Sequence, residues 1–195
     1  MLTLYTIGHS SHTAEHFTAL LQQHGIQKVV DTRSAPYSRY TPHFDRESLR
    51  DHLATAAIEY HYLGDAVGGR PREESCYDAD GRVLYSRVSR LPVFRDAIES
   101  LLQTAAQFRV ALLCSEEDPA HCHRRLLISR VLLSEGATIA HIRGDGRLQT
   151  DADVEAASGK LLIEPQPTLF SELEDRTWRS TSVIGTPAAR SMAQA

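Results

Sequence analysis

Thiol, imidazole and carboxylate side chains are concentrated in one short segment of the chain, Cys114–Arg124. The segment opens with Cys114 and Glu116 and closes with Cys122 and His123. A histidine can take the proton of a neighbouring cysteine and make it a nucleophile, and the same side chains can ligate zinc or iron. The segment therefore predicts either a reactive thiol or a metal site.

Several familiar motifs do not occur around these cysteines. No arginine lies six residues after either one, so the loop of tyrosine phosphatases is missing, and the two are eight residues apart rather than in a C-x-x-C pair. Gly64–Gly69 does not match the dinucleotide fingerprint, and no phosphate loop of nucleotide hydrolases occurs. The cofactor is thus unknown. A zinc or iron ion stays open, with Cys114, Cys122, His123 and His9 as ligands.

Arginine makes up 19 of the 21 basic residues, since only Lys28 and Lys160 are lysines. A GC-rich genome explains such a bias, so only the positions of the arginines carry information. A guanidinium grips phosphate or carboxylate through two parallel hydrogen bonds. We expect an anion-binding rim formed by Ser10, Arg33, Ser38, Arg39, Gly69, Arg70 and Arg124. The alternative is a structural network of salt bridges from these arginines to Asp31, Asp65, Glu116 and Glu117.

Strand and helix patterns alternate along the chain. Strands are predicted at Leu2–Ile7, Ile26–Asp31, Ile58–Leu63, Arg109–Cys114 and Ala137–Ile142. Helices are predicted after Thr13, after Asp45, from Pro92 and over Cys122–Ser134. This alternation is typical of an α/β fold, here a three-layer, Rossmann-like domain with a mostly parallel sheet of about five strands. We expect the strand order 3-2-1-4-5, followed by a C-terminal hairpin and tail.

Potentially reactive residues follow four of these strands. His9 follows the first, Arg33 the second, Arg70 the third and Glu116 the fourth. The loops at the carboxyl ends of parallel strands form the ligand crevice of such sheets. We therefore expect His9 and Cys114 to face each other across one crevice. The roles would be Cys114 or Cys122 as nucleophile or metal ligand, His9 or His123 as general base, and Asp31 or Glu116 as the group that orients a histidine or arginine.

Composition narrows the class of protein. A net charge of −4 argues against binding of nucleic acid over the whole surface. No apolar run approaches the roughly 18 residues of a membrane helix, and the first residues lack the pattern of a signal peptide, so we expect a cytoplasmic protein with no membrane partner. The three cysteines are expected to be thiols. Residues 1–150 are predicted to form the domain, and residues 151–195 a partly mobile extension without a domain of its own.

Five stretches of the chain resemble one known family. They are Tyr5–Ser10, Val29–Arg39, Gly68–Arg70, Leu112–Glu116 and Cys122–Arg124. They resemble the motifs of the widespread prokaryotic family catalogued as domain of unknown function 488, from the first strand to about Arg147. Thr32 departs from the apolar residue more usual there. The resemblance implies a cytoplasmic α/β protein with these motifs as its signature, and it supplies no reaction.

The leading hypothesis is an enzyme, a cysteine-dependent or metal-dependent hydrolase or transferase. Its substrate would be anionic and phosphate-bearing, a nucleotide or nucleic acid. A non-catalytic nucleic-acid-binding or regulatory module is the second hypothesis, and a thiol-based redox sensor using Cys114 and Cys122 is the third. The oligomeric state is not readable from the sequence.

Overall fold

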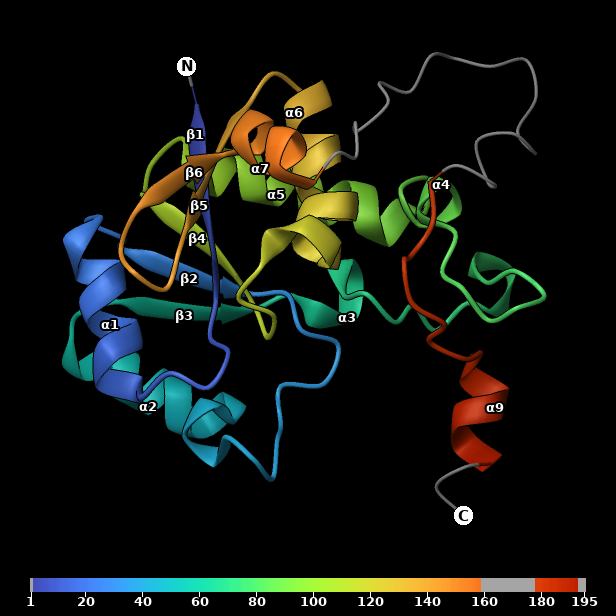
Figure 1. Ribbon diagram of the computed structural model, residues 1–195, viewed down its shortest axis with the longest axis horizontal. Coiled ribbons are helices and arrows are strands. Elements are labelled where there is room, and N and C mark those ends of the chain that lie inside the picture. Colours follow the sequence, from blue (N-terminus) through green and yellow to red (C-terminus); the bar gives the residue numbers. More distant parts are fainter. Residues whose placement is uncertain (1, 159–177, 193–195) are drawn as a thin grey trace.

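The computed structural model describes residues 2–158 and 178–192, and its centre is a sheet in the order β3-β2-β4-β1-β5-β6 (Figure 1). The strands are β1 (Thr3–Gly8), β2 (Lys28–Asp31), β3 (Glu59–Tyr62), β4 (Val110–Cys114), β5 (Thr138–Ile142) and β6 (Leu148–Thr150). The first five strands are parallel, and β6 pairs antiparallel with β5. The α/β class and the C-terminal hairpin are therefore as predicted.

Helices cover both faces of the sheet. On one face lie α1 (Ala14–Gln23) and α2 (Arg46–Thr55). On the other lie α5 (Pro92–Ala105) and a helix made of the π-helical segment η4 (Arg124–Ser129) and α6 (Arg130–Ser134) (Figure 1). The shorter elements are η1 (Pro42–Phe44), α3 (Gly64–Val67), η2 (Glu74–Cys76), α4 (Tyr85–Val88), η3 (Pro119–His121), α7 (Asp151–Ser158) and α9 (Pro187–Met192).

A hydrophobic core lies on each face of the sheet, and strand β4 contributes side chains to both, because successive side chains of a strand point to opposite faces. Leu112 belongs to the core that contains Phe94 of α5. Leu113 belongs to the core that contains Phe17 of α1. All five residues of β4 are buried. This double burial explains why its sequence is an unbroken apolar run.

The predicted strand order 3-2-1-4-5 is wrong in one place. It assumed that β1 and β2, consecutive in the chain, pair with each other. Instead β4 lies between them, paired with β2 on one side and with β1 on the other. A strand that is apolar on both faces is best covered in the middle of the sheet, and its insertion buries it completely. The neighbouring positions of β1 and β4, on which the predicted crevice depends, are confirmed.

The helix signals in the sequence were reliable, with one exception. Thr13 caps α1, its hydroxyl accepting a hydrogen bond from the amide of His16 at 3.2 Å. Pro92 begins α5 as expected. Asp45 precedes α2 but does not cap it, because its carboxylate accepts a hydrogen bond from the amide of Ser38 at 2.8 Å. No helix within the described ranges has the length and apolar character to cross a membrane.

The segment after residue 177 returns to the domain, which its polar composition did not indicate. Trp178 is 7% exposed and its indole nitrogen donates a hydrogen bond to the carbonyl of Leu126 at 2.6 Å. The backbone of Arg179 forms a bridge with Leu84, and Ser180 is buried. The sequence pattern also predicts an edge strand at Leu161–Ile163 and a short helix at Thr168–Glu174, and both lie outside the described residues.

Replacing Trp178 with alanine should lower the free energy of unfolding by about 3–5 kcal/mol, because it empties a large buried site. Urea titration measures this change. The matched control is Val183→Ala in the same segment: Val183 is 60% exposed, so its removal should cost less than about 0.5 kcal/mol. Equal and small losses in both variants would show that the segment does not stabilise the domain.

Candidate functional site

The pairing of β1 with β4 continues past the strands and joins the two motifs that follow them. Gly8 lies opposite Cys114, the amide of His9 donates to the carbonyl of Cys114 at 3.0 Å, and the amide of Ser10 donates to that of Ser115 at 2.8 Å. A Cβ on Gly8 would lie 1.8 Å from the carbonyl oxygen of Glu116. Only glycine therefore lets the loop after β4 cross the end of β1.

Four reactive side chains meet where β4 ends and the next helix begins. Their donor atoms, the sulfurs of Cys114 and Cys122, Oε2 of Glu116 and Nδ1 of His123, all lie within 4.8 Å of one another. The Cys114 and Cys122 thiols donate to Oε2 of Glu116 at 2.9 and 3.1 Å. The same sulfurs lie 3.5 and 4.0 Å from Nδ1 of His123. We call these four residues the thiol cluster.

Burial and hydrogen bonding set the charge of the thiol cluster. Burial raises the pKa of the Cys122 thiol well above its ordinary value, and the neighbouring Cys114 adds to the effect. Burial also works to raise the pKa of Glu116, but the hydrogen bonds from the two thiols outweigh it and lower that pKa to about 2. Tyr85 is buried nearby, and burial together with the two sulfurs raises its pKa, so its hydroxyl stays protonated at neutral pH. Burial and hydrogen bonding therefore keep Glu116 ionised beside the protonated thiol of Cys122.

Arg124 fixes the loop that carries Glu116. Its side chain is completely buried, and its guanidinium donates to the backbone carbonyls of Glu116 and Glu117 and to the hydroxyl of Thr6. Because these contacts face the interior, Arg124 positions the thiol cluster and does not line the pocket described below. Arg124 could make the predicted contact with a substrate only if it gave up its hydrogen bonds to this loop.

Arg33 is the centre of a second buried network. Its Nε and Nη2 donate to the two carboxylate oxygens of Asp31 at 2.9 and 2.6 Å. Nη2 also donates to the carbonyl of Phe44, and Nη1 donates to Nε2 of His9 at 3.2 Å. Tyr60 donates a further hydrogen bond to Asp31 at 2.6 Å. This is the salt-bridge network considered as the alternative to anion binding, and it uses four of the five N–H groups of Arg33.

His9 lies beside the thiol cluster and outside it. Its ring stacks on Phe44 with centroids 4.4 Å apart, its Nδ1 donates to the carbonyl of Ser10, and its Nε2 accepts from Arg33. Burial and the Arg33 charge lower its pKa to about 4. A general base needs a free lone pair, so His9 would first have to give up its bond with Arg33.

A pocket of about 500 Å³ borders the thiol cluster. Cys114, Glu116 and His123 line it, and we call this part of the lining its floor; Arg33, Gly69 and Arg70 also line it. Residues 180–184, from the returning C-terminal segment, also line it. Gly69 packs against the imidazole of His123, whose ring carbon would lie 3.0 Å from an added Cβ.

A scan against protein-family models finds the model described as "Domain of unknown function DUF488" over residues 13–131. The chain belongs to the DUF488 family. The match extends from α1 to the start of α6 and includes Arg33, Arg70 and the thiol cluster. His9 and the C-terminal wall of the pocket lie outside it. Neither a curated protein nor a solved structure matches the chain.

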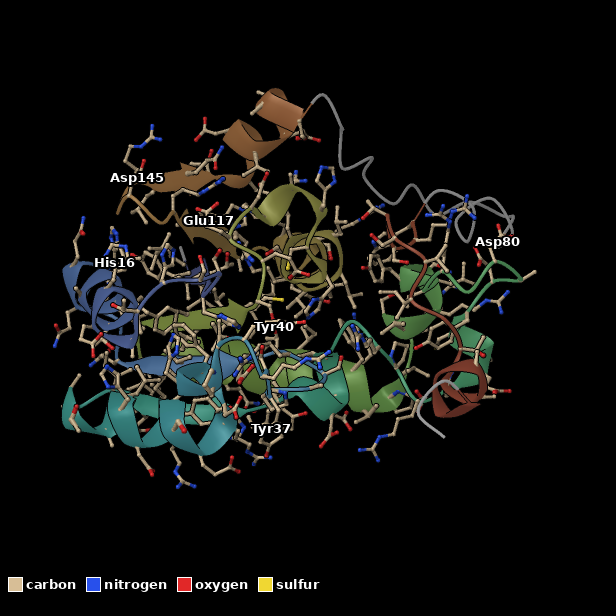
Figure 2. All side chains as sticks on the ribbon, turned by 60° about the horizontal axis from the view of Figure 1, so that its bottom comes forward. His16, Tyr37, Tyr40, Asp80, Glu117 and Asp145 are labelled. Atoms are coloured by element: carbon tan, nitrogen blue, oxygen red, sulfur yellow. The ribbon has the colours of Figure 1, made fainter. Side chains whose placement is uncertain are left out.

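The remaining predicted anion-binding residues of this DUF488 protein lie apart from the pocket. Ser10, two residues after β1, has a positive φ of 47°, and Ser38 accepts a hydrogen bond from the amide of Tyr40 at 3.2 Å. Arg39 is exposed beside the ring of Tyr40, on the loop between β2 and α2 that also carries Tyr37 (Figure 2). Of these loop residues, only Tyr37 also lines the pocket.

Glu117 takes no part in the thiol cluster, although it is the neighbour of Glu116. Its carboxylate accepts two hydrogen bonds from Arg143, at 2.9 and 2.7 Å, and one from the amide of Gly144. It lies near His16 and Asp145, at the upper left of Figure 2. The two adjacent glutamates therefore serve different parts of the molecule.

Sequence reasoning missed a buried chain of polar residues behind the thiol cluster. Thr6 bonds Nδ1 of His141 at 2.7 Å, His141 lies 3.3 Å from Asp151, and Asp151 accepts two hydrogen bonds from Arg125. Thr6, His141 and Arg125 lie within predicted strands and a helix, where polar side chains give no local sign of long-range partners, and Asp151 lies in the predicted extension. Tyr85 was missed for a different reason, since it lies within Gly64–Leu91, where no regular pattern can be read from the sequence.

The buried network predicts how stability depends on pH. The pKa of His9 is about 4 in the folded protein, against the ordinary histidine value of 6.5 for the unfolded chain. Between these two pH values the unfolded chain binds more protons than the folded protein, so the free energy of unfolding falls as the pH falls. From pH 7 to pH 5 this one residue should remove about 2 kcal/mol. His9→Gln keeps an acceptor for Arg33 and should abolish that part of the loss in urea titrations.

The control for this measurement is His61→Gln, which removes an exposed imidazole from β3. It should lose as much stability between pH 7 and pH 5 as the unaltered protein. If His9→Gln loses as much as His61→Gln, then His9 is not held neutral in the folded protein.

Proposed function

We propose that this DUF488 protein is an enzyme that acts on a phosphate-bearing substrate of nucleotide size. The observation that carries the proposal is the position of the thiol cluster: Cys114, Glu116 and His123 form the floor of the pocket. Reactive side chains that gather at the carboxyl ends of parallel strands, beneath a cavity, are the usual arrangement of a catalytic site in α/β proteins.

The size of the pocket favours a small molecule over a long polymer. A volume of about 500 Å³ lies within the range that encloses single metabolites and cofactors. The chain as a whole is acidic, with a net charge of −4, so its surface offers no general attraction for nucleic acid. A nucleotide or a nucleotide-like phosphate ester fits both facts.

Arg70 is the group best placed to bind the anion. Its amide donates to the hydroxyl of Ser34 at 3.0 Å, which fixes the backbone at the pocket wall. Within residues 2–158 and 178–192, its guanidinium has no ion-pair or hydrogen-bond partner, and the residue is exposed. Arg33, by contrast, can offer one N–H group at most, because its other four are bound. A phosphate is therefore expected to lie between Arg70 and the floor.

The rest of the wall suits the sugar and base of a nucleotide. Tyr37 is 57% exposed and lines the pocket, so its ring is available for stacking. Residues 180–182, Ser-Thr-Ser, also line the pocket, and Thr181 and Ser182 are exposed there with their hydroxyl-bearing side chains. The proposal places the protein in the cytoplasm, where its three free cysteines stay reduced.

Binding of adenosine 5′-monophosphate, measured by isothermal titration calorimetry, tests the anion site. Arg70→Ala should weaken binding about tenfold or more, because it removes a charge-assisted hydrogen bond worth about 1.5–3 kcal/mol. The matched control is Arg72→Ala, two residues along and outside the pocket, where the arginine pairs with Asp65 at 2.8 Å. It should change the affinity less than twofold. Equal losses in the two variants would assign the binding to general surface charge.

Release of nitrophenolate from the p-nitrophenyl ester of thymidine 5′-monophosphate tests catalysis. The unaltered protein should turn this phosphodiester over, and Cys114→Ser should reduce the rate at least about a hundredfold while circular dichroism shows an unchanged fold. Nucleotide binding without turnover would leave a binding module in place of an enzyme. Absence of both binding and turnover would end the proposal.

A further inference from the structure

We propose that the thiol cluster binds one divalent metal ion, zinc or ferrous iron, through the sulfurs of Cys114 and Cys122, Nδ1 of His123 and Oε2 of Glu116. The inference rests on the geometry of the cluster and not on the proposed function. It differs from the ligand set expected from the sequence, because Glu116 takes the place of His9.

The spacing of the four atoms is close to that around a tetrahedral ion. Bonds of about 2.3 Å to sulfur and about 2.0–2.1 Å to nitrogen or oxygen place neighbouring ligand atoms about 3.3–3.8 Å apart around zinc. The two sulfurs lie 3.5 and 4.0 Å from Nδ1 of His123, and 2.9 and 3.1 Å from Oε2 of Glu116. All four atoms lie within 4.8 Å of one another, so side-chain shifts of up to about an ångström would bring them to bonding distance.

The contacts of the His123 imidazole leave Nδ1 as the nitrogen that faces the other ligands. Its Nε2 lies 3.1 Å from the carbonyl oxygen of Thr32, and a carbonyl can only accept, so Nε2 carries the proton. In the neutral ring, Nδ1 then carries the lone pair that can ligate an ion. Metal-binding histidines commonly donate their second nitrogen to a carbonyl in this way, which fixes the ring orientation. Gly69 leaves the space that this orientation needs.

The donor types select the metal and the kind of site. Two thiolates and one imidazole favour zinc or ferrous iron over magnesium or calcium, which prefer oxygen ligands. Cys122 is 1% exposed and lies outside the pocket lining, whereas Cys114, Glu116 and His123 line the pocket. An ion held here would thus be buried on the Cys122 side and face the pocket on the other. The carboxylate of Glu116, on an exposed loop residue, is the ligand that a substrate can displace most easily.

Binding of an ion would change the charge of the cluster. A divalent ion replaces up to two thiol protons, so the four ligands and the ion together carry about one negative charge. Metal binding must therefore release protons, in proportion to the thiols that are ionised.

Titration of the reduced, chelator-treated full chain with Co²⁺ under anaerobic conditions tests the site. We expect one Co²⁺ per chain, a thiolate-to-cobalt charge-transfer band in the near ultraviolet and the intense visible bands of tetrahedral cobalt. Zinc should displace the cobalt. Cys122→Ser should lower the charge-transfer intensity by about half and weaken binding at least about tenfold. Glu116→Gln should weaken binding while the charge-transfer band persists, because both thiolates remain.

The third cysteine supplies the matched control. Cys76 is buried in the hydrophobic core that includes Val83, and it lies outside the thiol cluster. Cys76→Ala should bind cobalt with the same band and stoichiometry as the unaltered chain. An equal loss of signal in Cys76→Ala and Cys122→Ser, or no charge-transfer band in the unaltered chain, would overturn the site. So would mass spectra of the protein, purified with reductant, that show Cys114 and Cys122 joined in a disulfide.

X-ray absorption of the zinc-loaded, unaltered chain provides a test that does not depend on variants folding. Two sulfurs at about 2.3 Å and two nitrogen or oxygen atoms at about 2.0–2.1 Å are expected. A shell of four sulfurs, or one with none, would contradict the proposal. Cobalt binding without nucleotide binding would support the metal site and contradict the proposed function. Nucleotide binding without cobalt binding would contradict the metal site and leave the proposed function supported.

Discussion

The burial of one charge, the guanidinium of Arg124, constrains the whole reactive end of the molecule. Its partners are neutral oxygens, two backbone carbonyls of the loop after β4 and the hydroxyl of Thr6. An arginine deprived of such partners in the interior would cost several kcal/mol. If the loop after β4 moved, the guanidinium of Arg124 would lose these partners and would be left either exposed to solvent or buried without hydrogen bonds. The same carbonyls hold Glu116 over the end of β1, where Gly8 leaves room for them.

The constraint is transmitted across the core by a chain of hydrogen bonds with a fixed direction. The carboxylate of Asp151 can only accept, so His141 carries its proton on Nε2, the nitrogen that faces it. In the neutral ring, Nδ1 of His141 then accepts from the hydroxyl of Thr6, which itself accepts from Arg124. Burial lowers the pKa of His141, which favours this neutral form. The position of α7, where Asp151 begins the helix and binds Arg125, is thereby coupled to the loop that carries Glu116.

The sequence was most informative where chemistry and position coincide locally. Cys114, Glu116, Cys122 and His123 lie within ten residues, and their convergence follows from one strand, one loop and one helix. The strand order and the contacts between residues far apart in the chain could not be predicted from the sequence. The insertion of β4 between β1 and β2 depends on how both cores are covered, and the exclusion of His9 from the thiol cluster depends on Arg33, which holds its Nε2. Trp178 is a further example, because nothing near it in the sequence indicates that Leu126 accepts its hydrogen bond.

The arginines show why composition alone could not distinguish arginines that hold loops in place from an arginine available to bind an anion. Arg33, Arg124 and Arg70 follow strands or begin a helix at the same end of the sheet, and all three were expected to bind an anion. The first two are 4% and 0% exposed, and their donors are directed to Asp31 and to backbone carbonyls. Their charges are therefore largely committed to holding the loops in place. A rigid frame of this kind reduces the reorganisation that binding would require, so the exposed Arg70 and the thiol cluster can meet a ligand in geometry that is already formed. Arg33 and Arg124 thus hold the loops that form the site, and the exposed guanidinium of Arg70 is available to bind a ligand.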